Sequence, residues 1–598
     1  MLPSALWSLL FLSVFSSLVR AQRPVQTLFP GAIPLAVKTP YMSVWYEGLN
    51  TSASLSNYWP LVWGWGSAIM GWDGMIRVNG TTYRWMGSDP AGTAANVTNI
   101  QITPTRSIFV MQAGPMNPDD WVKQSIPFSY VSVEAQSLDG NSYPVQVYSD
   151  ITAEWASGDR PSLVRWSNTN TGKSVYHEIE LQNPQQNSEV ANQAQDGTVC
   201  YAISTMQARI TWQMDFDGNT RNQFQANGVL PNVGSTAFTT ITPVFPIFAL
   251  AVDLGTIKST GSPVTWSVGC VRDPSITYTT STGAVRQRRP YYVTQYSNID
   301  DASSVLQIDA FTGDYAGAHD RAVALDQKIM SAAAEISSQN LVSSDVKIFM
   351  KNLGTDRRVN PVEHIYAAFP AFLYLNASTG GALLDPLLAS QDSLADGTFA
   401  AQDIGDAYPA VPGPDAVPQQ GVEQSGNMLI MQLAHARISG DGTLLSQYRW
   451  ADYLVSNALK SENQTNQDED TAVAAAGLAN LALKGIIGVK AMAEIAFALG
   501  EDLDANQYGN QASTLLSSWL SLATSSGGSR LLGSYGDQQS WSLMYNLFAD
   551  KMLGLNFVDQ SVIDMQTQYL GGLLATAPQW GLAIDSTAEG LTAVVSGR

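Results

Sequence analysis

The amino-acid sequence predicts a multidomain β + α fold, in which an N-terminal antiparallel β-sandwich precedes a toroid of α-helical hairpins. Up to about Asp314 the chain is a series of short segments rich in β-branched and aromatic residues, separated by Gly, Pro and Asn-Gly turns. Beyond Asp314, apolar residues recur at helical spacing in segments of roughly 12 to 20 residues. We therefore expect a β-sandwich domain over residues 22–318 and a helical domain over residues 319–598.

The N-terminus has the pattern of a signal peptide over residues 1–21. Its apolar core is shorter than the roughly 20 residues that a membrane-spanning helix needs, and small residues at Val19 and Ala21 suit cleavage after Ala21. We expect a secreted, extracellular protein without a membrane anchor. Five Asn-X-Ser/Thr sites agree with a secreted glycoprotein, although such sites also arise by chance: Asn50, Asn79, Asn96, Asn376 and Asn463.

The cysteine, histidine and charge content limits the kinds of site and partner that we expect. The two cysteines, Cys200 and Cys270, would form one disulfide in an oxidising compartment, but their spacing leaves open whether they approach each other. The four histidines lie far apart and lack any metal-ligand or triad spacing, so we expect no metal and no cofactor. A net charge of −20 argues against nucleic acid or an anionic membrane as a partner.

The β half contains a tryptophan-rich stretch, NYWPLVWGWGSAIMGWDG, which begins at Asn57. Such a density of aromatic rings can line a ligand cleft, and Trp63 is our candidate for substrate contact. The same stretch is also typical of the core between two sheets or of a domain interface.

In the helical half, the segments that begin near residues 421 and 481 are apolar nearly all round, which predicts buried helices of an inner ring. The segment LLSQYRWADYLVSNAL is amphipathic, as an outer helix should be. We also expect helices at SDVKIFMKNLG and WSLMYNLFADKMLG.

The candidate site lies where GVEQSGNMLIM opens the 421 helix. Four polar residues, Glu423, Gln424, Ser425 and Asn427, stand at the mouth of a helix that is otherwise buried. Buried polar groups cost free energy unless they are paired or face a ligand. Three further carboxylates precede or open helices nearby in the sequence: Asp403, Asp406 and Asp470. Ordinary helix capping, a solvated loop or the helix dipole would also account for acidic residues at these places.

The chain resembles the secreted fungal glutaminase A family. The resemblance is carried by segments in family order along nearly the whole chain, among them IPLAVKTPYMSVW, GWDGMIRVNGTTYRWMG, VQVYSDITAEWASGD, VGCVRDPSITY, VEQSGNMLIM and SWSLMYNLFADKMLGLN. It implies an N-terminal β-sandwich, a six-hairpin glycosidase-like helical domain that forms an (α/α)6-type helical toroid, and hydrolysis of L-glutamine to L-glutamate and ammonia. Where the family commonly reads PVEECGNMLIM, this chain has Gln424 in place of an acid and Ser425 in place of a cysteine. We also expect the toroid to be incomplete at its C-terminus, because the family continues beyond the segment that matches LAIDS.

Amide hydrolysis needs an attacking oxygen, a stabilised oxyanion and a proton for the leaving ammonia. Our hypothesis is that Glu423 acts as general base or acid with Asp403 or Asp470 as its partner. Gln424 and Asn427 would bind the substrate, with Ser425, Asp406 and Trp63 as further contacts. The alternatives are a glycoside hydrolase and a catalytically inactive carbohydrate-binding relative, so the expected partner is L-glutamine or a glycan.

Overall fold

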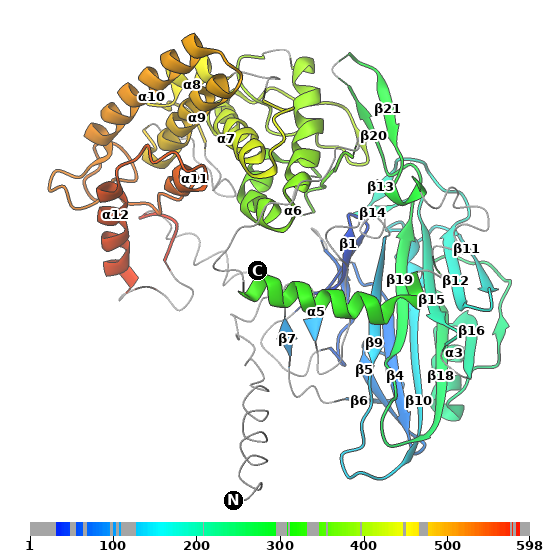
Figure 1. Ribbon diagram of the computed structural model, residues 1–598. Helices are drawn as coiled ribbons and strands as arrows, with labels where there is room; N and C mark the ends of the chain where they lie inside the picture. The colour runs from blue at the N-terminus through cyan, green and yellow to red at the C-terminus, as the bar shows by residue number, and fades with distance from the viewer. Residues whose placement is uncertain are drawn as a thin grey trace, which may run out of the picture.

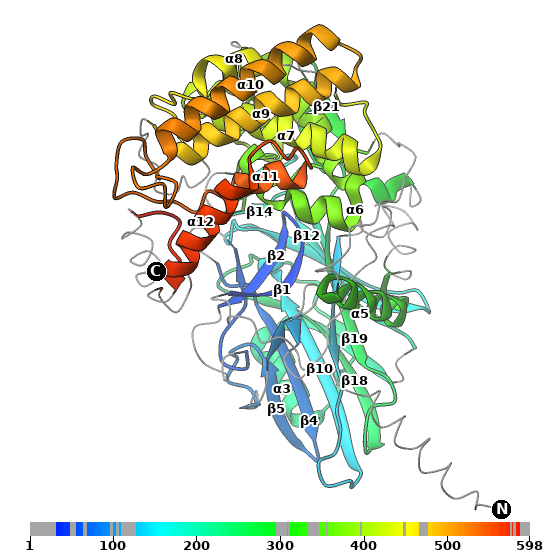
Figure 2. The same ribbon diagram turned by 60° about the vertical axis from the view of Figure 1, so that its left-hand side comes forward.

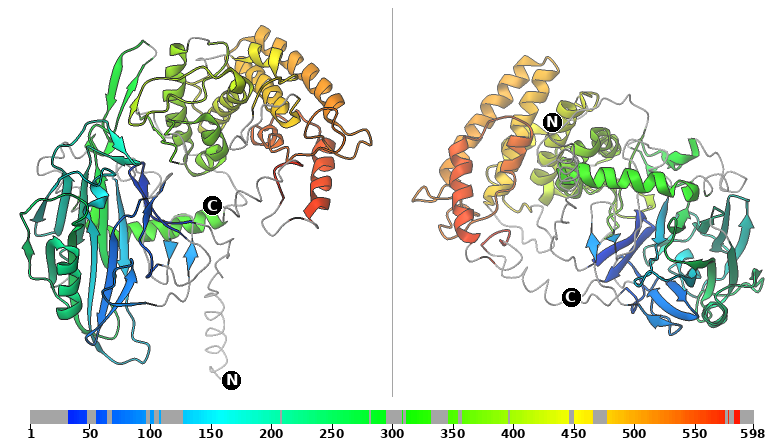
Figure 3. Two further views of the ribbon diagram at one scale, coloured as in Figure 1. Left: turned by 180° about the vertical axis from the view of Figure 1, so that it is seen from behind. Right: turned by 60° about the horizontal axis from the view of Figure 1, so that its bottom comes forward.

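The computed structural model confirms that a β-sandwich is followed by a helical domain (Figure 1). It describes residues 32–47, 55–63, 68–95, 100–102, 107–108, 127–206, 209–280, 282–294, 308, 311–331, 346–353, 357–394, 397–445, 450–465, 477–574, 577 and 582–586. Two views from other directions show the strands stacked in one body and α6 to α12 gathered in a second body (Figures 2 and 3).

Two mainly antiparallel sheets build the sandwich. The larger has the order β17-β16-β18-β10-β4-β5-β6, and the smaller has the order β11-β12-β15-β19-β9. The strands of the larger sheet are Val233–Gly234, Ile210–Phe216, Pro246–Ile257, Tyr143–Thr152, Trp72–Val78, Thr81–Met86 and Thr93–Ala94. Those of the smaller are Val164–Asn170, Ser174–Leu181, Thr198–Ser204, Val264–Val271 and Phe128–Val133.

Large apolar side chains from the facing strands fill the space between the two sheets. Trp266 of β19 lies 6.4 Å from Trp85 of β5, and Trp166 of β11 lies 5.5 Å from Phe248 of β18, measured between ring centroids. The Trp266 indole also donates a hydrogen bond of 3.3 Å to the backbone of Leu250 across the same space. These contacts confirm the sandwich, because they join residues that lie on different sheets.

Cys200 and Cys270 do not form the disulfide that the sequence left open, because both cysteines are buried and free. They lie on the paired strands β15 and β19, but Cys200 stands opposite Gly269 and Cys270 stands opposite Val199. Directly opposed residues of an antiparallel pair project to the same face, and neighbouring residues along a strand project to opposite faces. The two thiols therefore lie on opposite faces of the sheet and cannot be joined in this register.

Several short strands, one helix and two 3-10 turns accompany the two large sheets. A sheet of β1 (Ala32–Thr39), β2 (Met42–Glu47) and β3 (Leu61–Val62) lies beneath the helical domain in Figure 2. The pairs β7 (Gln101–Ile102) with β8 (Ser107–Ile108) and β13 (Glu189–Val190) with β14 (Gln193–Ala194) are short hairpins. Helix α3 (Asp217–Asn227) follows β16, and 3-10 turns η1 (Ala153–Ala156) and η2 (Tyr291–Thr294) follow β10 and β21.

Two sets of contacts join the sandwich to the helical domain. Strand β20 (Ile276–Thr279) pairs with β21 (Val285–Arg288) and, in parallel, with β22 (Ala410–Val411) from the loop that precedes the candidate site. The buried Lys351 ammonium lies 2.6 Å from the Glu189 carboxylate of β13, which also accepts a 3.0 Å hydrogen bond from Tyr41. The loop before the candidate site is therefore fixed to the sandwich.

The helical domain contains α6 (Val362–Ser390), α7 (Gly421–Ser439), α8 (Ala451–Asn457), α9 (Ala479–Ala498), α10 (Asp502–Ala523), α11 (Leu547–Met552) and α12 (Gln560–Leu573), with 3-10 turns η3 (Gln391–Ser393) and η4 (Pro418–Gln420). The predicted burial of the 421 and 481 helices is confirmed, because α7 is buried from Gly421 to His435 and α9 over most of its length. Glycine lets these two helices approach closely: a Cβ on Gly488 would lie 3.1 Å from the Gly426 Cα atom.

Other sequence expectations for this half were less accurate. The segment SDVKIFMKNLG is not helical over 346–351, where Lys351 instead bridges to Val359. Helix α5 (Tyr315–Ser331), which spans the predicted domain boundary, lies beside the sandwich in Figure 1, and its Tyr315 packs edge-on against Tyr130 of β9. No described helix is long and apolar enough to cross a lipid bilayer.

Candidate active site

Glu423 lies in the first turn of α7, and its side chain has no solvent-exposed surface. Gln424, Ser425 and Asn427 are equally buried. The Lys484 ammonium of α9 forms an ion pair with Glu423 Oε1, and both side chains are fully buried. The polar residues at the start of α7 therefore lie in the interior of the domain, where α7 meets α9, and do not form an exposed helix cap.

Lys484 reaches Glu423 because the two helices cross at small residues. A Cβ on Gly426 would lie only 2.9 Å from the Lys484 Cγ atom, so a larger residue at position 426 would displace the lysine stem. The Lys484 Nζ atom lies 4.4 Å from the ring centroid of Tyr366 on α6 and 5.7 Å from that of Tyr545. These are cation–π contacts, which are strongest where water is excluded.

The two tyrosines are half-buried, so each has part of its surface exposed while the ion pair beside them is fully buried. Burial, followed by the nearby Glu423 carboxylate, raises the pKa of Tyr366 above its ordinary value. Tyr366 is therefore a neutral phenol next to the ion pair. We call Tyr366, Glu423, Gln424, Asn427 and Lys484 the Glu423 cluster.

Asn427 connects the ion pair to a second group of polar residues. Its Nδ2 donates to Glu423 Oε1 at 3.1 Å and to Gln424 Oε1 at 3.2 Å. Gln424 in turn donates to Glu363 Oε2 of α6 at 3.0 Å. Arg358 forms an ion pair with Glu363 and another, of 2.6 Å, with Asp403. Hydrogen bonds and ion pairs thus run without a break from Asp403 to Lys484.

Two acceptor atoms of the Glu423 cluster are not used. Among the described residues, Glu423 Oε2 and Asn427 Oδ1 accept no hydrogen bond, although both atoms are buried. An unmade hydrogen bond at a buried acceptor costs about 1 to 3 kcal/mol. Buried acceptors without donors are rare in folded proteins, and they commonly mark a place where a ligand or water binds.

The predicted residues separate into those that the structure brings together and those that it does not. Glu423, Gln424 and Asn427 lie together. Asp403 does not contact Glu423, because Arg358, Glu363 and Gln424 lie between them in the chain of contacts. Burial raises the pKa of Asp403 despite the opposing effect of Arg358. Asp403 therefore binds Arg358 at the end of this series of contacts and is not the direct partner of Glu423.

The other predicted site residues do not belong to the Glu423 cluster. Ser425 Oγ accepts a 2.9 Å hydrogen bond from the backbone of Ala400, which ties the preceding loop to α7. Asp406 is exposed. Trp63 is 41% exposed on the sandwich and lies 5.0 Å from Trp45, between ring centroids. Asp470 lies outside the described residues.

Among the predicted glycosylation sites, Asn79 and Asn463 are exposed, and Asn376 is half-buried at a kink within α6. Asn50 and Asn96 lie outside the described residues.

Sequence reasoning missed Lys484, Tyr366, Glu363 and Arg358. A signal for Lys484 was present: it is a lone charge within LALKGIIG, a segment otherwise apolar on all sides. A lysine buried in such a helix needs a carboxylate partner, and Glu423 was the acidic residue of the other apolar helix. No comparable signal exists for Arg358 and Glu363: they pair with each other, and their other partners, Asp403 and Gln424, lie on later segments.

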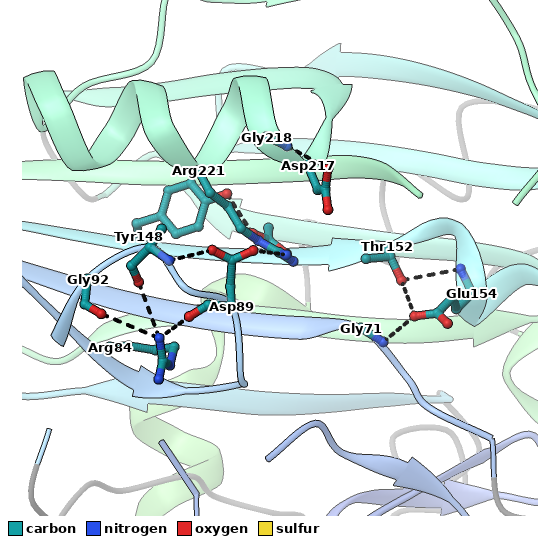
Figure 4. A network of polar contacts seen from close by, with 12 residues as sticks. Gly71, Arg84, Asp89, Gly92, Tyr148, Thr152, Glu154, Asp217, Gly218 and Arg221 are labelled. Carbon is teal, nitrogen blue, oxygen red and sulfur yellow. Dashed lines mark hydrogen bonds and ion pairs between the residues drawn. The ribbon is translucent and has the colours of Figure 1, made fainter. Parts of the chain in front are cut away.

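A second cluster of buried charge lies within the β domain (Figure 4). Arg221 of α3 binds both oxygens of Asp150 at 2.8 and 2.9 Å and Asp89 at 2.9 Å. Tyr148 donates a 2.5 Å hydrogen bond to Asp150. Asp73, directly opposite Asp150 on β4, is fully buried, and neither of its oxygens has a hydrogen-bond partner among the described residues. We call Asp73, Asp89, Tyr148, Asp150 and Arg221 the Arg221 cluster.

The described residues contain no group of three or more His, Cys, Asp or Glu side chains that could hold a metal ion. The Glu423 cluster itself offers carboxylate, ammonium, amide and phenol groups.

Comparison with known proteins defines the class of this chain. A family model described as the glutaminase A six helical-hairpin domain matches residues 317–594, and a model for a domain of unknown function (DUF5127) matches residues 105–332. The chain is 34% identical over 584 residues to Glutaminase A of Aspergillus oryzae, with 90% of this chain and 83% of that protein covered. A probable glutaminase of Arthroderma benhamiae is 26% identical over 670 residues, with 92% and 75% covered.

Two solved structures are also similar in arrangement. A bacterial glucoamylase complexed with acarbose is 9% identical, with a TM-score of 0.43 and coverage of 92% of this chain and 81% of that one. An inverting GH92 mannosidase of Bacteroides thetaiotaomicron is 9% identical, with a TM-score of 0.35 and coverage of 85% and 63%. The fold and the matched models define a β-sandwich protein with a six-hairpin helical domain. The chain belongs to the glutaminase A family, as its resemblance predicted.

Proposed function

We propose that this protein hydrolyses L-glutamine to L-glutamate and ammonia at the Glu423 cluster. The observation that carries the proposal is the fully buried Glu423–Lys484 pair, which lies on the two central helices of a glutaminase A-type domain. The similarity to a protein named Glutaminase A supports the choice of substrate.

The cluster has the groups that the reaction needs. Lys484 and Asn427 both bind Glu423 Oε1, which leaves Oε2 to accept a proton. A water molecule would give its proton to Oε2 while its oxygen bonds to the amide carbon, and the C=O electron pair would move to oxygen. The nearby ammonium charge of Lys484 would stabilise that oxyanion. When the C=O bond re-forms and the C–N bond breaks, Glu423 would return the proton to the departing nitrogen.

The contacts of Ser425 argue against a different mechanism, in which this serine would be the nucleophile. Ser425 has its oxygen engaged by the Ala400 backbone. A serine nucleophile needs a base within hydrogen-bond reach, and no hydrogen bond within the described part of the chain joins Ser425 to one. The half-buried Tyr366 and Tyr545 mark the side from which a substrate would approach Lys484.

Formation of L-glutamate from L-glutamine by the purified full chain tests the proposal. We expect Glu423→Gln, which keeps the size of the side chain, to lower kcat by about 100- to 10,000-fold, the usual range for loss of a general base. Gln432→Met on the same helix is the matched control, because Gln432 is equally buried and binds only the Leu444 backbone. Unchanged turnover in Glu423→Gln would show that the ion pair is structural. Release of sugar from glycans in place of glutamate would favour the glycosidase alternative.

We also propose secretion, which the signal-like residues 1–21 and the exposed Asn79 and Asn463 support. N-terminal sequencing and deglycosylation of protein from the culture medium would test it, and retention of residues 1–21 in mature protein would contradict it.

A further inference from the structure

Two buried acceptor atoms of the Glu423 cluster have no donor among the described residues, and they bear on which substrates the site can recognise. Glu423 Oε2 and Asn427 Oδ1 are buried, and neither accepts a hydrogen bond within the described part of the chain. They belong to side chains one helical turn apart on α7 that contact each other through Asn427 Nδ2 and Glu423 Oε1. Residues at this spacing lie on the same face of a helix, so the two acceptors belong to one site.

The amide orientation of Asn427 is fixed by its surroundings. Its Nδ2 faces two oxygens, Glu423 Oε1 and Gln424 Oε1, at 3.1 and 3.2 Å. Rotating the amide by a half-turn would place its oxygen against both of these acceptors and lose two hydrogen bonds. Asn427 Oδ1 is therefore held as an acceptor, directed away from Gln424.

We infer that Glu423 Oε2 and Asn427 Oδ1 together accept the two N–H groups of a primary carboxamide, so that the site selects primary amides over N-substituted amides. A –CONH2 group has two N–H donors on one nitrogen, which matches two unused acceptors on neighbouring side chains. The inference rests on the proposed function, and it adds that the leaving nitrogen is recognised through its hydrogens.

The same arrangement is consistent with the proposed proton transfers. A carboxylate oxygen has two lone-pair positions, so Glu423 Oε2 can accept one N–H of the amide and one O–H of the attacking water. Contact between Oε2 and the amide nitrogen also places the proton donor beside the bond that breaks.

The test compares three γ-amides of L-glutamate: the unsubstituted amide (L-glutamine), the N-methylamide and the N,N-dimethylamide. These carry two, one and no N–H groups, and L-glutamate is the product measured for all three. A site whose buried polar groups are built for an N–H group rejects analogues that lack it by large factors. We expect kcat/KM to fall about 100-fold or more from L-glutamine to the dimethylamide, with the methylamide between them.

Variants show whether Asn427 is responsible. In Asn427→Leu, which removes the acceptor at similar volume, the preference for L-glutamine over the methylamide should shrink about tenfold. The matched control Gln432→Met should keep the full preference, although Gln432 Oε1 is also buried without a partner. The ratio of two substrates does not depend on the fraction of folded protein, so partial misfolding of a variant does not affect the result. Equal hydrolysis of the three amides by the wild type, or an unchanged ratio in Asn427→Leu, would overturn the inference while leaving glutamine hydrolysis intact.

Binding separates a failure of the inference from a failure of the proposed function. If L-glutamine is not hydrolysed, titration calorimetry with L-glutamine and the methylamide still measures recognition. Tighter binding of L-glutamine to the wild type, lost in Asn427→Leu, would support primary-amide recognition. Equal binding of the two amides, or no binding of either, would overturn it.

Discussion

Asp150 in the Arg221 cluster of the β domain and Glu423 in the Glu423 cluster of the helical domain are both buried against a cation, but they differ in how completely their oxygens are paired. Asp150 is bound at both oxygens by Arg221 and also accepts a hydrogen bond from Tyr148. Glu423 is bound at Oε1 alone, and Oε2 is left without a donor. Full pairing is typical of a group whose role is to hold a fold, and incomplete pairing leaves a position for a ligand.

The surroundings of the two clusters explain this difference. Arg221 has a rigid guanidinium fork that binds a carboxylate at two points, and it holds α3 against the face of the large sheet (Figure 4). Lys484 has a single ammonium on a flexible stem and can engage another oxygen without losing the first contact. Asp150 and Asp73 are fixed by strand register, whereas the Glu423 cluster forms where α6, α7 and α9 converge.

The most severe test of this comparison removes the cation of the helical cluster. Lys484→Met leaves the Glu423 carboxylate buried and unpaired, which should cost about 3 to 5 kcal/mol in the free energy of unfolding. Glutamate formation should also fall by at least 100-fold, because the charge that stabilises the oxyanion is lost. Urea unfolding and turnover assays would check both effects.

A double variant separates the two effects. Glu423→Gln combined with Lys484→Met removes both charges, so stability should return most of the way to that of the wild type while activity stays lost. If Lys484→Met alone is as stable and active as the wild type, the ion pair is unimportant and the comparison fails.

The corresponding test in the β domain should affect stability alone. Arg221→Met leaves Asp150 and Asp89 without their shared cation, and we expect a loss of about 3 to 5 kcal/mol with kcat per folded molecule unchanged. Arg165→Met is the control, because the Arg165–Glu180 pair is exposed and should contribute less than about 1 kcal/mol. A lower kcat in folded Arg221→Met would mean that the β-domain cluster takes part in function.

These two clusters also show how much could be predicted from the sequence. The β-then-α order followed from the periods of apolar residues, and the burial of α7 and α9 followed from their apolar surfaces. The polar start of α7 could be singled out from the sequence because four polar residues precede an apolar run, and the structure shows that these four side chains are buried. Local patterns of this kind are visible without tertiary structure.

The partners of Glu423 required the fold. Asp403 precedes α7 in the sequence, but Arg358 binds it, and that pairing depends on how two loops pack. Helix α6 is kinked at the non-helical Asn376 and contains Pro370 and Pro386, and sequence rules place a proline at a helix end. The pairing of the two cysteines had to stay open because strand register, which sets the face of each thiol, is not determined by spacing.

Asp403→Asn tests whether Asp403 takes part in the reaction or only binds Arg358. The amide keeps the shape of the carboxyl but removes the charge that binds Arg358, so we expect a loss of about 1 to 3 kcal/mol in stability. Because Asp403 acts on Glu423 only through Arg358, Glu363, Gln424 and Asn427, kcat should fall by less than about tenfold and KM should not change. A loss as large as that of Glu423→Gln would return Asp403 to the reaction itself.

The smallest expected effect concerns Asp73, whose oxygens lack donors although the Arg221 cluster is otherwise paired. Burial, reinforced by Asp150 and Asp89 and opposed by Arg221, raises the pKa of Asp73 well above its usual value. A carboxyl whose pKa is higher in the folded protein holds its proton more tightly there than in the unfolded chain. Its contribution to stability is therefore complete below the unfolded-state pKa of about 3.9 and is lost progressively as the pH rises from that value toward the folded-state pKa.

Asp73→Asn, which cannot ionise, should abolish this dependence. The variant should match the wild type near pH 4 and be more stable by about 1 to 2 kcal/mol at neutral pH, as measured by urea unfolding across that range. The difference between variant and wild type isolates Asp73 from the other carboxyls that titrate in both proteins. If the difference does not grow with pH, then Asp73 is ionised in the folded protein, and the β-domain cluster, like the Glu423 cluster, holds a charged carboxylate with unused acceptor oxygens.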